Sequence, residues 1–141
     1  ALTRGLPTYR EMKIQHSKAM VKREISLFSG LQGAYATSTL FVSHRWEKKD
    51  QPDANAKQQK ELQAYLRQKE NQHIKFVWFD FWCLPQPGKD GRSKAEQKEF
   101  DRMMPNIALL CLSCSVLILL DPQPPRFWGA FERGARCSGP R

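Results

Sequence analysis

The chain has 141 residues, of which 40% are hydrophobic and 11% aromatic, so it can form one domain around a single buried core. Its 23 Lys and Arg residues against 14 Asp and Glu residues give a formal net charge of +9. This charge favours acidic protein partners, anionic membranes or phosphate-bearing ligands. The basic residues are scattered, without a dense run or a groove-reading helix, which argues against a dedicated nucleic-acid-binding protein.

The cysteine count argues against a disulfide scaffold and favours a reducing, intracellular compartment, either the cytoplasm or an organelle lumen or stroma. Cys111 and Cys114 have CxxC spacing, but no second Cys or His pair lies nearby, so we expect no metal site. The apolar run 107–120 is shorter than the about 20 residues of a membrane span. Because the chain begins at Ala1, we expect a removed targeting segment or a piece of a longer protein.

Residues 8–30 are predicted to form one helix that packs on the outside of the core. Thr8 can cap its first turn, with Glu11 three positions later as in a capping box, and Gly30 can end it. A membrane-surface helix is the alternative. The apolar stripe of this helix consists of Ile14, Val21, Ile25 and Phe28, and Lys18 interrupts it.

Three dense apolar runs are typical of strands that are buried on both faces: 38–46, 73–82 and 115–121. A helix between the first two is capped by Asp53 and carries a narrow apolar stripe. A second helix, over 94–112, contains Pro105, which should kink or split it. The order strand, helix, strand, helix, strand, helix predicts a parallel sheet with helices on both faces. The first stripe consists of Leu62, Tyr65 and Leu66; the second of Phe100, Met104, Ile107 and Leu110 or Cys111.

The expected fold class is therefore α/β: a three-layer, flavodoxin-like fold with a short parallel sheet of three evident strands and an extra N-terminal helix. We divide the chain into an N-terminal helix and linker, residues 1–39, and an α/β domain, residues 40–141. We expect this domain to be incomplete at its C-terminus.

Chemically active side chains follow each predicted strand. Open parallel sheets bind ligands beyond the carboxyl ends of their strands, so these positions are candidate sites. The first strand leads into Ser43–Trp46, where Arg45 can pair with a phosphate or carboxylate. Asp80 and Trp82 follow the second strand, and Asp121 follows the third, ahead of Glu132.

Each of these residues also has a structural reading. His44 and Arg45 would form an ordinary polar loop, and Asp80 would cap the loop that follows it. Glu132 taken alone would be a solvated charge. Its aromatic neighbours would anchor the last helix in the core. The expected convergence of three loops at one edge favours a functional site. The aromatic neighbours are Phe127, Trp128 and Phe131.

The motifs LFVSHRWE, FVWFDFWCLPQ, SVLILLD and FWGAFE occur in an order that resembles the Toll/interleukin-1 receptor (TIR) fold. The resemblance covers residues 40–132. It is strongest to a divergent TIR-like group found in single-celled algae and some bacteria.

In TIR domains that cleave NAD, a glutamate lies four residues after a Trp in a WCxxE pattern. Here the matching pair is Trp128 and Glu132, with Gly129 in place of the Cys. The resemblance implies that Glu132 is the catalytic residue of an NAD nucleosidase, a hydrolase for which NAD is the substrate and no cofactor or metal is required. It also implies a ligand-binding set and an interaction loop over 84–93. The first comprises Ser43, His44, Arg45, Trp46, Trp82 and Trp128; the second includes Leu84, Pro85, Gln86, Pro87, Gly88 and Lys89.

The chain departs from the family because the TIR fold has more parallel strands than the three evident here. The residues after Glu132 contain glycine and proline, which disfavour a long final helix that could hold a catalytic group. The third strand would also form an open apolar edge, and such edges pair or are covered. The first hypothesis is therefore a protein-interaction or assembly module, including an accessory subunit of a larger complex. The alternative is an NAD-cleaving enzyme.

Overall fold

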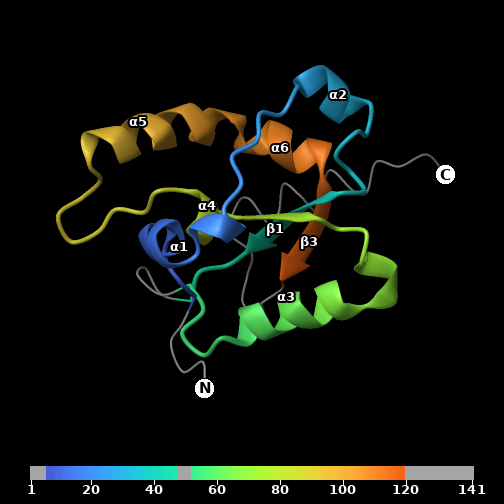
Figure 1. The fold of residues 1–141 in the computed structure, drawn as a ribbon, viewed down its shortest axis with the longest axis horizontal. Helices are drawn as coiled ribbons and strands as arrows, with labels where there is room; N and C mark the ends of the chain where they lie inside the picture. Colours follow the sequence, from blue (N-terminus) through green and yellow to red (C-terminus); the bar gives the residue numbers. More distant parts are fainter. Residues whose placement is uncertain (1–5, 48–51, 120–141) are drawn as a thin grey trace.

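The computed structural model describes residues 6–47 and 52–119 (Figure 1). In this part, short 3-10 turns at 17–19, 69–71 and 104–106 separate the regular elements. The helices and strands in chain order are α1 (Tyr9–Gln15), α2 (Leu27–Leu31), β1 (Thr39–His44), α3 (Lys57–Arg67), β2 (Phe76–Phe79), α4 (Asp80–Cys83), α5 (Lys94–Met103), α6 (Ile107–Ser113) and β3 (Ser115–Leu119).

The three strands form one parallel sheet in the order β2-β1-β3. Helix α3 lies on one side of this sheet, and α5 and α6 lie on the other, with α2 beside α6 (Figure 1). The predicted α/β architecture, a three-stranded parallel sheet flanked by helices, is confirmed. It follows from two crossovers, the first from β1 through α3 to β2 and the second from β2 through α5 and α6 to β3, which return parallel strands to the same sheet.

The core lies between the sheet and α3. Leu40 and Val42 of the central strand are buried there together with Phe79 of β2 and Leu62 of α3. The narrow apolar stripe expected on α3 is confirmed, because Tyr65 and Leu66 pack against the same cluster. Burial differs between the strands: the first four residues of β1 are buried, whereas all five residues of the edge strand β3 remain partly exposed.

The helix predicted over 94–112 is split near Pro105, as expected. Helix α5 ends at Met103, the 3-10 turn contains the proline, and α6 begins at Ile107. A proline removes a backbone donor and clashes with the preceding turn, which accounts for the break. The Asn106 side chain donates to the Arg102 carbonyl at 2.9 Å across this junction.

The single helix predicted over 8–30 is wrong. Thr8 and Glu11 form the expected capping box, but α1 ends at Gln15, and Met20 has an extended backbone. The chain then passes the start of β2, where the Arg23 guanidinium lies 4.1 Å from the centroid of the Phe76 ring. The apolar stripe that favoured one helix has little core to face. Of its members, Ile14, Val21 and Phe28 are exposed.

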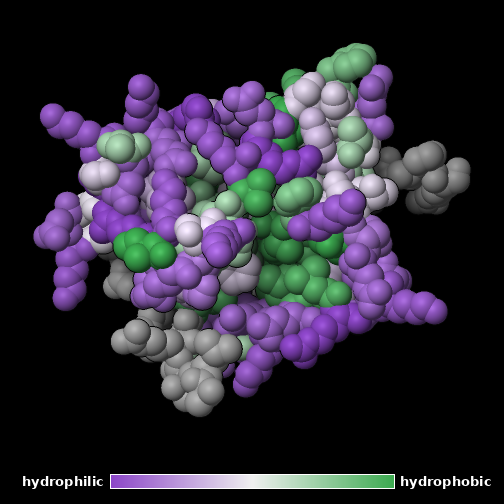
Figure 2. All heavy atoms as spheres, viewed as in Figure 1, coloured by the Kyte–Doolittle hydropathy of each residue, from purple (hydrophilic) through white to green (hydrophobic). Residues whose placement is uncertain are grey.

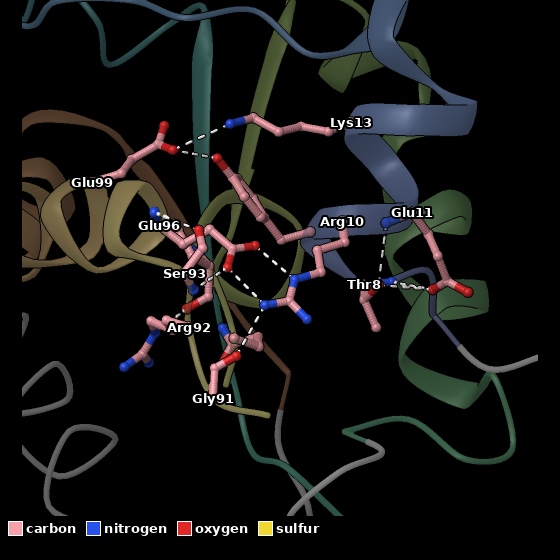
Figure 3. A network of polar contacts seen from close by, with 12 residues as sticks. Thr8, Arg10, Glu11, Lys13, Gly91, Arg92, Ser93, Glu96 and Glu99 are labelled. Carbon is pink, nitrogen blue, oxygen red and sulfur yellow. Dashed lines mark hydrogen bonds and ion pairs between the residues drawn. The ribbon is translucent and has the colours of Figure 1, made fainter. Parts of the chain in front are cut away.

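Helix α1 is attached to α5 by polar contacts (Figure 3). Arg10 donates from Nε and Nη2 to the two carboxylate oxygens of Glu96, at 2.6 and 2.7 Å. Tyr9 and Lys13 both donate to Glu99, at 2.5 and 3.2 Å. The hydrogen bond from Arg10 is the main reason that the pKa of Glu96 falls to about 2. The start of the predicted N-terminal segment is thus bound to the α/β layers.

Candidate functional site at the carboxyl end of the sheet

The parallel strands bring His44 and Asp80 together, because His44 ends β1 and Asp80 directly follows β2. The Nε2 atom of His44 lies 2.5 Å from Oδ1 of Asp80. The indole Nε1 of Trp46 donates to the other carboxylate oxygen, Oδ2, at 3.0 Å. The imidazole is buried, with 1% of its side chain exposed, whereas the Asp80 side chain is 29% exposed. The pair therefore has a buried end and a solvent-facing end.

Gln58 of α3 determines which His44 nitrogen carries a proton. Its Nε2 donates to the backbone carbonyls of Arg45 and Pro52, at 2.8 and 3.1 Å. Carbonyls only accept, so the amide oxygen must face Nδ1 of His44, at 2.8 Å, and Nδ1 must donate. On the opposite side of the ring, Nε2 of His44 lies within hydrogen-bonding distance of Oδ1 of Asp80. Gln58 and Asp80 therefore hold the imidazole at both of its nitrogens.

Asp53 holds Gln58 in place through the first turn of α3. Its two carboxylate oxygens accept from the backbone N–H groups of Gln58 and Gln59, at 3.0 and 2.8 Å. Asp53 is itself buried, and Ala56 precedes the helix in a left-handed conformation with φ of 53°. Ala56 occupies the N-cap position without a side-chain cap, and Asp53, three residues earlier, accepts from the first turn in its place, so the predicted capping role of Asp53 is confirmed. The cap therefore links the start of α3 to the orientation of His44.

Aromatic rings surround the polar pair. The His44 ring stacks on Phe79 at 4.1 Å between centroids, and Phe79 contacts Trp82 at 4.7 Å. The Trp46 ring meets Phe81 edge-on at 5.3 Å. Trp82 lies beside this cluster, and its buried Nε1 has no hydrogen-bond partner within residues 6–47 and 52–119. The site thus combines a fixed carboxylate with aromatic walls.

The structure brings together some of the residues predicted from the sequence and separates others. His44, Trp46 and Trp82 lie at one end of the sheet, as expected. Arg45 contributes its backbone carbonyl, while its Nη1 is buried without a partner in the described part of the chain. Ser43 faces the opposite side of the sheet from His44, because successive side chains alternate along a strand.

Three expected site residues, Asp121, Trp128 and Glu132, lie outside the described residues. Asp80 was expected either to bind a ligand or to cap the next loop. Its side chain contacts His44 and accepts from Trp46, while its backbone carbonyl accepts from Leu84. Sequence reasoning missed Gln58, a polar residue in the first turn of a helix whose pattern carries no sign of a contact with β1.

The loop over 84–93 has a buried base and an exposed tip. Leu84 and Pro85 are buried, and Arg92 donates from Nε to the Pro85 carbonyl at 2.6 Å. Gln86 donates to the Asp80 carbonyl at 3.3 Å, which ties the base to the candidate site. The tip is closed by a backbone bridge between Gly88 and Gly91. The exposed part of the predicted interaction set consists of Pro87, Gly88 and Lys89.

Within the described residues, no group of three or more His, Cys, Asp and Glu side chains could hold a metal ion. The same residues include no helix long and apolar enough to cross a membrane. Burial raises the pKa of the Cys83 and Cys114 thiols to about 11, so both are protonated at neutral pH.

Comparisons with known proteins do not identify a family. A scan against protein-family models, a search of curated proteins and a search of solved structures each find no match. The resemblance to the TIR fold therefore stays a prediction. The contacts of the described residues are the basis for the functions considered next.

Proposed function

We propose that this chain is a protein-interaction module with a TIR-like fold that docks a partner against the open side of its sheet. The observation that supports this proposal is the partial exposure of the apolar strand β3. It lies at the edge of the sheet, four of its five residues are Val, Leu or Ile, and all five are partly exposed. Apolar edges of this kind are paired or covered in stable assemblies.

Helix α6, which contacts β3, and α2, which contacts α6, carry further exposed apolar side chains. Phe28 and Leu31 of α2 are 72% and 70% exposed, and Leu112 of α6 is 59% exposed. The two helices are in close contact, because Gly30 of α2 packs against Ser113 of α6. Figure 2 shows apolar atoms gathered over β3, between α6 and α3, and again over α2. Exposed apolar surfaces of this kind mark interaction sites.

Charge supports an acidic partner. The chain carries a formal charge of +9, so two copies would repel each other over long distances. Exposed basic side chains precede both helices of the surface: Lys22 and Arg23 before α2, and Arg102 before α6. A partner with an apolar strand or helix and an acidic rim complements this pattern. An accessory subunit of a larger complex would bind in the same way.

Site-specific photo-crosslinking tests the proposal. A photoreactive residue at Leu31 should crosslink an acidic protein in an extract of the source cells, while the same group at Ile14 should not. Ile14 is a matched control because it is 80% exposed but lies on α1, away from α2 and α6 (Figure 1). Leu31→Glu should abolish the complex and Ile14→Glu should leave it intact. Crosslinks to anionic phospholipid alone, or equal crosslinking from both positions, would overturn the proposal.

Cleavage of NAD is the second candidate. It is favoured by the convergence of His44, Trp46 and Asp80 at the edge where open parallel sheets bind ligands. In this hypothesis Glu132, matched through the family resemblance, stabilises an oxocarbenium-like ribosyl centre while the bond to nicotinamide breaks. Purified protein should then release nicotinamide from NAD, and Glu132→Ala should abolish the release while Glu61→Ala does not. Absence of turnover by the wild type would eliminate this candidate.

A further inference from the structure

The Asp80 side chain is partly exposed, and its carboxylate retains acceptor positions. Oδ1 contacts His44 and Oδ2 accepts from Trp46. Each carboxylate oxygen can accept two hydrogen bonds, so one position on each oxygen remains. His44 is almost fully buried while Asp80 is partly exposed. The remaining positions therefore belong to the more exposed member of the pair, at the carboxyl end of the sheet.

His44 and Trp46 hold this carboxylate in a fixed orientation. The His44 ring is bonded to Gln58 on its far side and stacks on Phe79, so it cannot turn freely. The Trp46 ring is held edge-on against Phe81. A binding group that is already oriented loses less conformational entropy when a ligand arrives.

The acceptor positions of Asp80 determine what kind of ligand suits it. No group of side chains that could hold a metal ion lies within the described residues. Two acceptor oxygens on one planar group match two adjacent hydroxyl donors. The partly exposed Trp46 ring supplies an apolar surface next to them.

We propose that Asp80 is the recognition residue of a binding site for vicinal diols, the hydroxyl pair found in free sugars and in the ribose of nucleotides. The proposal is independent of the docking surface at β3 and does not require that NAD be cleaved. Asp80 accepts one hydrogen bond from each hydroxyl, and the Trp46 indole N–H remains bonded to the same carboxylate. Loss of one hydroxyl leaves an acceptor unpaired in the complex.

Nuclear magnetic resonance of the wild-type protein tests this directly through the indole Nε1–H signal of Trp46, assigned by its loss in Trp46→Phe. The probes are D-ribose with 2-deoxy-D-ribose, and AMP with 2′-deoxy-AMP. We expect the fully hydroxylated member of a pair to shift this signal and to bind about tenfold or more tightly than its deoxy analogue. A response to AMP alone identifies a nucleotide ligand, and a comparable response to ribose identifies a free sugar.

A matched pair of variants locates the effect. Asp80→Asn should weaken binding by about tenfold or more, because it replaces one acceptor oxygen with a donor. Asp90→Asn, at the exposed loop tip, should leave affinity unchanged. Equal binding of hydroxylated and deoxy probes, or no shift of the Trp46 signal with any probe, would overturn the proposal. The probe comparison is made on the wild-type protein and does not use Asp80→Asn, so it remains decisive if that variant fails to fold.

Discussion

Replacing Asp53 with alanine tests whether the cap of α3 supports both the fold and the site. The carboxylate is 1% exposed and accepts from two backbone N–H groups, those of Gln58 and Gln59. Water cannot readily replace a buried acceptor, so Asp53→Ala leaves both donors without a partner. The first turn of α3 should loosen, and with it the contact between Gln58 and His44.

The expected magnitude follows from these two hydrogen bonds. Loss of a helix N-cap costs about 0.5–2 kcal/mol, and a hydrogen bond to a charged group contributes about 1.5–3 kcal/mol. We therefore expect Asp53→Ala to lower the free energy of unfolding by about 2–4 kcal/mol. Asp53→Asn keeps one acceptor oxygen and loses the charge, so its effect should be about half as large.

Urea denaturation followed by tryptophan fluorescence measures both effects, and an unchanged slope with urea shows that the unfolding reaction is the same. Asp101→Ala is the matched control, because this carboxylate is exposed on α5 and accepts from Gln97. Its effect should stay within about 0.5 kcal/mol. If Asp53→Ala is no more destabilising than Asp101→Ala, the buried cap does not have the assigned role.

Three further predictions concern other contacts. Glu96 has its pKa lowered to about 2, chiefly by the hydrogen bond from Arg10. The stability that its ionised form contributes is therefore complete above pH 4.5 and is lost as the pH falls toward 2. In Glu96→Gln, the denaturation midpoint should depend less on pH across this range than in the wild type. Gly30→Ala should cost about 1–3 kcal/mol in thermal unfolding, because its new Cβ would lie 2.3 Å from Ser113 Oγ. Adding Ser113→Gly should restore much of the loss, and a full loss in the double variant would contradict the steric cause. Cys83, with its pKa raised to about 11, should react with a thiol reagent at pH 8 far more slowly in the folded protein than in urea.

The sequence predicted the elements whose signals are local. Dense apolar runs indicated all three strands, and Pro105 indicated the break between α5 and α6. The capping box at Thr8 and Glu11 was also readable, because its partners are three residues apart. The length of the first helix was not readable. Its apolar stripe suggested continuity, but little core lies opposite those side chains, and Arg23 instead packs on Phe76.

The candidate site shows the same division. Residue type alone marked His44 and Trp46 as polar or aromatic groups at the end of a strand. The hydrogen bonds that join them to Asp80 span 34 to 36 positions in sequence and depend on the register of two parallel strands. Gln58 had no local signal, since its role exists only once α3 packs over the sheet.

The amino-acid sequence by itself determined the α/β class, the three strands, the capped helix start at Asp53 and the helix break at Pro105, because each depends on residues close together in the chain. Only the tertiary structure decided that His44 contacts Asp80, that Ser43 faces away from them and that β3 lies at the partly exposed edge. Those outcomes depend on strand order, register and helix packing, in which distant residues become neighbours through burial of the shared core.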